Sequence, residues 1–215
     1  MSAASTTGVQ PVTVAAFVLA GGASRRFGSD KALASFGGET LLAKMCRRVE
    51  AAAGVVRIVA PPGRYPDLPG EIVEDGWPGE GPLGGIITAL KATQLSRPDC
   101  EWNLIVSCDM PFLTADWLRF MIDHACAAAS EVIAPQSAHG WEPLCACWRT
   151  SSLATLRTAF EQGTRKVTDA MKLLPMEILD ETHWKRFDIG GRLFWNMNTP
   201  QDYKDAARIL ESERA

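Results

Sequence analysis

Long apolar runs are absent from this 215-residue sequence, and the apolar segment over residues 14–19 is too short to cross a membrane. The net charge of −3 gives no basic excess of the kind that favours nucleic-acid binding. The six cysteines form no Cys-x-x-Cys pair, so we expect no zinc site and predict free thiols in a reducing compartment. These absences predict a cytoplasmic protein without a membrane or nucleic-acid partner.

Residues 1–12 are mostly small and polar, and they lack the basic start of a secretory signal. We expect them to form a disordered tail. Residues 13–212 are enough to bury a sizeable core, and a composition of 47% hydrophobic and 22% charged residues is ordinary for a globular protein. We therefore expect one folded domain over this range.

Strand and helix patterns alternate along most of the chain. Residues 14–19 and 55–60 read as buried strands, and residues 39–53 between them place apolar side chains at helical spacing. This unit predicts a parallel strand pair with a right-handed crossover. Further strands are expected at 71–74, 102–107, 131–135 and 142–148, with a loop at 136–141 between the last two. Further helices are expected at 83–94, 114–129, 151–161 and 200–210. The pattern predicts an α/β fold, a three-layer Rossmann-like, mostly parallel sheet with helices on both faces and a mixed C-terminal part.

The first strand ends in a glycine turn, Gly21-Gly22, and the cations Arg25, Arg26 and Lys31 follow it closely. Glycine lets a backbone approach a ligand, and successive N–H groups in such a turn can form an anion-binding nest. The turn matches neither the Walker loop nor the Gly-x-Gly-x-x-Gly fingerprint. A solvated turn with solubilising charges is the alternative for Gly-Gly alone. Together with the three cations, the turn predicts a nucleoside triphosphate site.

Two aspartates stand where expected strands end. Asp109 follows the strand at 102–107, where a carboxylate can hold Mg²⁺, although it can equally cap the turn before the next helix. Asp75 follows the strand at 71–74 and is placed to bind a base or a sugar, or to form a turn before Gly76. Because ligands of open α/β sheets bind beyond the carboxyl ends of strands, both aspartates are candidate site residues.

Three further features leave two interpretations each. Residues 77–86 form a second glycine-rich loop, whose helix start can bind an anion or whose glycines can allow close packing of helix on strand. Arg165 and Lys166 can contact a second phosphate or belong to a solvated helix start. Asn196 and Asn198 alternate on an expected strand and would therefore share one side of it, where they could meet a ligand. The alternative is that their segment is simply the start of the next helix, which Thr199 caps.

Several of these strings resemble the molybdenum cofactor guanylyltransferase family. Leu-Ala-Gly-Gly at 19–22, Arg-x-Gly at 26–28 and Asp-Lys at 30–31 are similar to its signature loop, in which Met usually stands at the place of Phe27. Similar strings follow in the family's order at 81–86, 109–113, 142–144, 165–166 and 196–200. The resemblance extends from residue 14 to about residue 210. It implies a glycosyltransferase-A-type fold with a nucleotide half over 13–113 and an acceptor half over 114–212.

The resemblance implies transfer of GMP from GTP to molybdopterin or Mo-molybdopterin, with release of pyrophosphate and with Mg²⁺ or Mn²⁺ as cofactor. Asp109 would hold the metal, and Arg26, Lys31 and Asp109 would be catalytic. The nucleotide would meet Leu19, Ala20, Gly21, Gly22, Lys31, Asp75, Gly81 and Asp109. The acceptor would meet Arg165, Lys166, Asn196 and Asn198. Transient contacts with molybdenum-insertion proteins and target-enzyme chaperones are also implied.

Other functions stay open at this point. Some family members carry an asparagine near the base after the second strand, where this chain has Val59-Ala60-Pro61-Pro62, so cytidylyl transfer to the same pterin is a close rival. A noncatalytic nucleotide-binding regulator is a second alternative, against which the presence of both Lys31 and Asp109 argues. A sugar-1-phosphate nucleotidyltransferase would be expected to have a longer chain.

Overall fold

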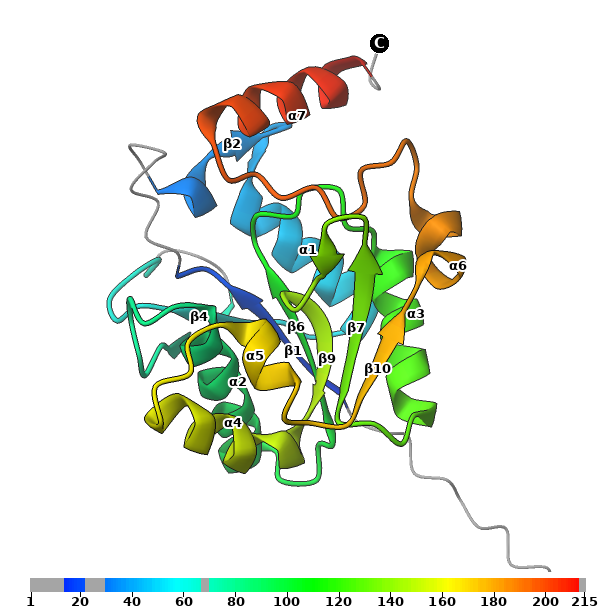
Figure 1. Cartoon of the computed structure of the whole chain (residues 1–215). Helices are drawn as coiled ribbons and strands as arrows, with labels where there is room; N and C mark the ends of the chain where they lie inside the picture. The colour runs from blue at the N-terminus through cyan, green and yellow to red at the C-terminus, as the bar shows by residue number, and fades with distance from the viewer. Residues whose placement is uncertain (1–13, 22–29, 67–69, 213–215) are drawn as a thin grey trace, which may run out of the picture.

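A mixed sheet forms the middle layer of the computed structural model, which describes residues 14–21, 30–66 and 70–212 (Figure 1). Over these residues the sheet has eight strands in the order β10-β7-β9-β6-β1-β4-β5, and β8 pairs with β7. The strands are β1 Val14–Leu19, β4 Arg57–Ala60, β5 Glu71–Glu74, β6 Trp102–Ser107, β7 Val132–Ser137, β8 Gly140–Trp141, β9 Cys145–Arg149 and β10 Met176–Leu179. A separate hairpin consists of β2 Ser35–Phe36 and β3 Glu39–Thr40.

The strand directions confirm the predicted α/β fold with a mixed C-terminal part. β1 pairs in parallel with both β4 and β6, and β4 pairs in parallel with β5. β9 is antiparallel to β6 on one side and to β7 on the other, so β7 and its parallel neighbour β10 run in the direction of β1. The carboxyl ends of β1, β4, β5, β6, β7 and β10 therefore meet at one edge of the sheet, which we call the functional edge.

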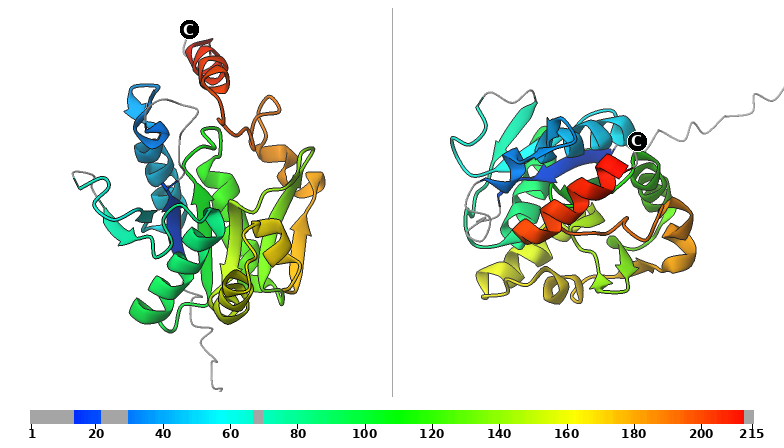
Figure 2. Two further views of the ribbon diagram at one scale, coloured as in Figure 1. Left: turned by 60° about the vertical axis from the view of Figure 1, so that its left-hand side comes forward. Right: turned by 90° about the horizontal axis from the view of Figure 1, so that it is seen from above.

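Helices cover both faces of this sheet, as Figures 1 and 2 show. Alternate residues of β1 explain the two layers: Ala16 and Val18 belong to the core under α1 and α3, whereas Phe17 and Leu19 belong to the core under α2 and α4. The helices are α1 Leu41–Ala53, α2 Pro82–Ser96, α3 Ala115–Ala127, α4 Leu153–Glu161, α5 Val167–Met171, α6 Glu181–Trp184 and α7 Pro200–Ser212. Short 3-10 turns cover Lys31–Leu33, Thr150–Ser152 and Lys185–Phe187.

Helix α1 shows how the local sequence sets an element's ends. The Thr40 hydroxyl accepts a hydrogen bond from Ala43 N at 3.1 Å, which satisfies a free donor of the first turn. Gly54 ends the helix with a left-handed φ of 80°, a conformation that glycine adopts without strain. The helix was expected from residue 39, but Glu39 and Thr40 form strand β3, because the Gly37-Gly38 turn pairs them with β2.

Two expectations about the C-terminal half are wrong. Residues 136–141 were expected to be a loop, but Gln136 and Ser137 continue β7 and pair with β8. Residues 196–198 were expected on a strand, but they form a loop at the functional edge. There, Met197 N donates to Asp109 O at 2.9 Å, and the Met197 side chain is buried beside Phe36, Leu41 and Ala206 of α7. This hydrogen bond and the packing of Met197 hold the segment beyond the end of β6, outside the sheet.

All six cysteines are free thiols; Cys100, Cys108, Cys145 and Cys147 are buried, and Cys46 and Cys126 are half-buried. None of the helices in the part of the chain that the structure describes has the length and apolarity needed to cross a membrane. The expected tail and the residues Gly22, Arg25 and Arg26 lie outside the described residues.

The start of α2 packs so closely that one glycine is required there. A Cβ on Gly84 would lie 2.9 Å from Trp77 Cβ, so we expect Gly84→Ala to lower the free energy of unfolding by about 1–3 kcal/mol through overpacking. The control is Gly85→Ala, whose Cβ would meet only Leu19 side-chain atoms at 3.4 Å or more, and which we expect to be neutral or stabilising. Urea unfolding of both variants checks this. Equal free energies of unfolding for the two variants would contradict the packing role of Gly84.

Candidate functional site

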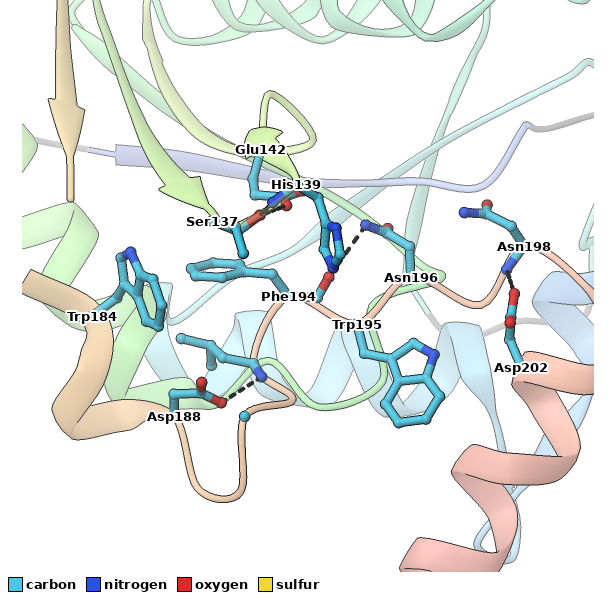
Figure 3. Close-up of a pocket in the computed structure, with 13 residues that line it drawn as sticks. Ser137, His139, Glu142, Trp184, Asp188, Phe194, Trp195, Asn196, Asn198 and Asp202 are labelled. Carbon is cyan, nitrogen blue, oxygen red and sulfur yellow. Dashed lines mark hydrogen bonds between the residues drawn. The ribbon is translucent and has the colours of Figure 1, made fainter. Parts of the chain in front are cut away.

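Two cavities lie at the functional edge, and Asp109 links them. The first, which we call the glycine-loop cavity, has a volume of about 390 Å³ and is lined by residues that include Leu19, Gly21, Asp75, Gly81 and Asp109. The second, which we call the aromatic cavity, has a volume of about 540 Å³ and is lined by residues that include Ser137, Glu142, Trp184, Phe194, Asn196 and Asn198 (Figure 3). The hydrogen bond from Met197 N to Asp109 O joins the loop between the two asparagines to the end of β6.

Asp75 lies at the carboxyl end of β5 with one oxygen bound to protein and the other turned to the glycine-loop cavity. Its Oδ1 accepts hydrogen bonds from Trp77 N at 3.0 Å and from Thr88 Oγ1 at 3.1 Å. Its Oδ2 lies 3.8 Å from the point where a Cβ of Gly21 would be. The turn interpretation and the ligand interpretation of Asp75 therefore apply to different oxygens of the same carboxylate.

The glycines of this cavity have different physical roles. Gly81 precedes α2 with a φ of 93°, which a side chain would strain. Gly21 does not have a positive φ. A Cβ there would touch Pro61 Cδ at 3.5 Å and reach toward Asp75, so Gly21 keeps space open at the cavity wall. Ala20 precedes Gly21, and its backbone N–H donates to Val59 O at 2.9 Å.

Lys31 forms an ion pair with Asp109, which lines the glycine-loop cavity. Lys31 Nζ lies 2.9 Å from Asp109 Oδ2, and the two side chains are only 13% and 20% exposed. The other oxygen, Asp109 Oδ1, is buried and has no hydrogen-bond partner within the described part of the chain. A buried carboxylate oxygen without a partner carries a desolvation penalty that a bound cation would relieve.

The donor set around Asp109 fits a hard divalent cation that is shared with a substrate. Magnesium prefers oxygen ligands and commonly binds one or two carboxylates together with phosphate oxygens. Over residues 14–21, 30–66 and 70–212, no group of three or more His, Cys, Asp or Glu side chains could hold a metal by itself. A cation at Asp109 Oδ1 would therefore draw its remaining ligands from substrate and water.

Tyr65 is a residue of this site that no sequence pattern indicated. Its hydroxyl lies 2.9 Å from Asp30 Oδ2 and 3.2 Å from Ala20 O, and so connects the residues on either side of the first glycine loop. Asp30 also accepts from Ala32 N and pairs with Arg64 at 2.8 Å. Burial, helped by the nearby Asp30 carboxylate, raises the pKa of the Tyr65 phenol, which therefore stays a donor. Tyr65 has a φ of 59°, a strained value for a bulky residue.

A buried carboxylate and aromatic rings form the aromatic cavity. Glu142 is 8% exposed, and its Oε1 accepts a hydrogen bond from Ser137 Oγ at 2.6 Å. Burial raises the pKa of Glu142, an effect that hydrogen bonds from Ser137 and Asn196 oppose. Trp184 and Phe194 meet edge to face with ring centroids 5.3 Å apart. The string at 142–144 resembles one in the family, but no sequence pattern indicated Glu142 itself as a site residue.

The four residues expected to bind the acceptor do not lie together. Asn196 and Asn198 both line the aromatic cavity. Arg165 lines neither cavity: its Nε lies 2.8 Å from Glu80 Oε2, and its guanidinium lies 4.0 Å from the centroid of the Phe160 ring. It therefore connects the second glycine loop to α4. Lys166 is the exposed residue that precedes α5, and it also lines neither cavity.

Comparisons with known proteins agree with this geometry. Residues 16–175 match the family model described as MobA-like NTP transferase domain. A probable molybdenum cofactor guanylyltransferase from Chloroflexus aggregans is 32% identical, with 87% of this chain and 90% of that protein covered. A protein of the same description from Nostoc sp. is 34% identical, with 87% of each covered. The crystal structure of molybdopterin-guanine dinucleotide biosynthesis protein A from Archaeoglobus fulgidus has the same fold, with a TM-score of 0.79 at 24% identity over 92% of this chain and 98% of that one.

The hydroxyl of Tyr65 gives a prediction that a double-mutant cycle can check. We expect Tyr65→Phe to lower the free energy of unfolding by about 1–2 kcal/mol, because buried groups lose a hydrogen-bond partner. In the Asp30→Ala background, Tyr65→Phe should lower the free energy of unfolding by about 1 kcal/mol less, because the carboxylate that accepts from the Tyr65 hydroxyl is already absent. Urea unfolding of the four proteins measures the coupling. Additive losses would show that the phenol and the carboxylate do not interact.

Proposed function

The chain belongs to the family of MobA-like NTP transferases, and we propose that it transfers GMP from GTP to molybdopterin or Mo-molybdopterin and releases pyrophosphate. The relatives described as molybdenum cofactor guanylyltransferases support GTP and molybdopterin as its two substrates. Cytidylyl transfer to the same pterin, the close rival from the sequence, is not better supported by these relatives. The product is the guanine dinucleotide form of the cofactor.

The observation that carries this proposal is the position of Asp109 between the two cavities. Asp109 lines the glycine-loop cavity, and its carbonyl holds the loop that carries Asn196 and Asn198 into the aromatic cavity. We assign GTP to the glycine-loop cavity and the pterin substrate to the aromatic cavity. The acceptor phosphate and the α-phosphate of GTP then meet at Asp109.

The chain's own groups align the phosphates and neutralise their charge. An acceptor phosphate has a second pKa near 6 and is largely ionised at neutral pH, so it attacks without a strong general base. Asp109 holds the Lys31 ammonium at the edge of the cavity, where it can meet the charge that develops on the phosphates. Asp109 Oδ1 would hold Mg²⁺, or Mn²⁺ in its place, and such an ion supplies Lewis-acid stabilisation of phosphate oxygens.

Several parts of the proposal rest on the resemblance rather than on described geometry. Gly22 and Arg26 would contact the phosphates, but they lie outside the described residues. Arg165 and Lys166 would serve the acceptor only after Arg165 leaves Glu80. A cytoplasmic location and transient contacts with molybdenum-insertion proteins and target-enzyme chaperones complete the proposal.

Pyrophosphate release tests the proposal directly. The assay contains the purified chain, Mg²⁺ and molybdopterin, with GTP or CTP as the nucleotide. Release with GTP alone is the expected result. Release with CTP alone would overturn the guanylyl assignment but keep nucleotidyl transfer, and no release with either would overturn the enzymatic function.

The Lys31–Asp109 pair should be essential for transfer. We expect Lys31→Ala and Asp109→Ala each to lower kcat/KM by about 100-fold or more, because charge stabilisation at the transferred phosphoryl group is lost. Lys172→Ala is the matched control, since it removes an exposed Lys–Asp pair of the same 2.9 Å length away from both cavities. Circular dichroism checks that all three variants fold. Turnover at the unmodified rate in either site variant would remove that residue from the catalytic site.

Asp75 should contribute to nucleotide selection. Guanine presents a ring N–H and an amino group side by side, and one or both oxygens of a carboxylate can accept hydrogen bonds from them. Cytosine has no such pair of adjacent donors. We expect Asp75→Ala to lower the preference for GTP over CTP by roughly tenfold, and the exposed neighbour Glu74→Ala to leave it unchanged. Competition binding of the two nucleotides measures the ratio. An unaltered ratio in Asp75→Ala would exclude Asp75 from base recognition.

A further inference from the structure

Glu142 is held rigidly at the inner side of the aromatic cavity. Its backbone N–H donates to Pro135 O at 2.9 Å, and its carbonyl accepts from Cys145 N at 3.0 Å. One carboxylate oxygen accepts from Ser137 Oγ at 2.6 Å. Ser137 and Glu142 lie at opposite ends of the β7–β8 hairpin, and Figure 3 shows their side chains turned toward each other. The hairpin therefore fixes the carboxylate before any ligand enters.

This carboxylate has no cationic hydrogen-bond partner among the described residues. The neutral hydroxyl of Ser137 donates to it, and His139, which lines the same cavity, opposes the rise of its pKa less than burial causes it. Within the described ranges, no lysine or arginine nitrogen lies within ion-pair distance of Glu142. Burial accordingly raises the pKa of Glu142. A buried carboxylate with neutral partners is unfavourable until a ligand supplies N–H donors.

Aromatic side chains give the same cavity an apolar wall. Trp184 and Phe194 contact each other edge to face, and Trp184 is held in place by a hydrogen bond from its Nε1 to Gln136 O at 3.0 Å. Trp195 also lines the cavity, and its ring centroid lies 6.0 Å from that of Phe112. Such rings favour a planar heteroaromatic ligand.

On the basis of the proposed function, we infer that Glu142 selects the acceptor by binding the amino-pyrimidinone edge of its pterin ring. That edge carries a ring N–H next to an exocyclic amino group, two adjacent donors that a carboxylate accepts in parallel hydrogen bonds, as it does from a guanidinium. Asn196 lines the same cavity as Glu142, and the next residue, Met197, donates to Asp109 O. Recognition of the ring is thereby connected through two consecutive residues to the place where the phosphates meet.

Binding of two simple pteridines at neutral pH tests this role. The probes are pterin, which carries the 2-amino group next to its ring N–H, and lumazine, which has a carbonyl oxygen there with an N–H on each side and so offers no two adjacent donors. Fluorescence titration of the full chain should give at least about tenfold tighter binding of pterin, since a hydrogen bond to a charged group contributes roughly 1.5–3 kcal/mol. In Glu142→Gln the ratio should fall close to one, and in Ser137→Ala to an intermediate value. Glu177→Gln, whose carboxylate pairs with His124 outside both cavities, should keep the full preference.

Two controls keep the outcomes separate. GTP binding by Glu142→Gln should match the unmodified chain, which shows that the variant folds. An equal pterin-to-lumazine ratio in Glu142→Gln and in the unmodified chain, or no pterin binding at all, would overturn the role of Glu142 even if GTP-dependent pyrophosphate release is normal. Conversely, the expected ratios without any pyrophosphate release would overturn the proposed function and uphold pterin recognition by Glu142.

Discussion

The functional edge depends on Asp109, because two segments that are distant in the sequence are bound to this one residue. Asp109 lies two residues after the end of β6, its carboxylate pairs with Lys31 near the start of the fold, and its carbonyl accepts from Met197 near the end. The Lys31–Asp109 pair is largely shielded from water, so its attraction is screened less than that of a surface pair. Both cavities therefore keep a fixed position relative to one carboxylate. This arrangement suits a reaction that needs two phosphates brought into line more than it needs covalent participation by the protein.

Most of the fold follows from simple patterns in the sequence. Short apolar runs and helical spacing located the strands and helices of the parallel part, and parallel strands bring their carboxyl ends to one edge. That rule alone placed Asp75 and Asp109 on one cavity. The mixed part was harder, because β8 is only two residues long and the loop at 196–198 is shaped by its contact with Asp109. Neither the periodicity nor the residue types of the sequence indicate such a contact.

The site residues also differ in whether the sequence alone could indicate them. Tyr65 lies in a proline-rich loop without periodicity, and only the folded chain brings its hydroxyl to Ala20 and Asp30. Glu142 is a single carboxylate beside a proline, and its importance follows from burial without a cationic partner. Adjacent cations at 165–166 suggested a phosphate contact, yet Arg165 is bound to Glu80 in this structure. Sequence indicates which residue types are present at strand ends, whereas packing decides which charges are left for a ligand.

The most direct test of this account is a crystal structure of the chain with Mn²⁺, a non-hydrolysable GTP analogue and pterin, in which anomalous scattering locates the metal. We expect the Mn²⁺ peak at Asp109 Oδ1, the triphosphate next to Lys31 in the glycine-loop cavity, and the pterin ring against Glu142 in the aromatic cavity. A manganese site away from Asp109, or both ligands in one cavity, would contradict the central role given to this carboxylate.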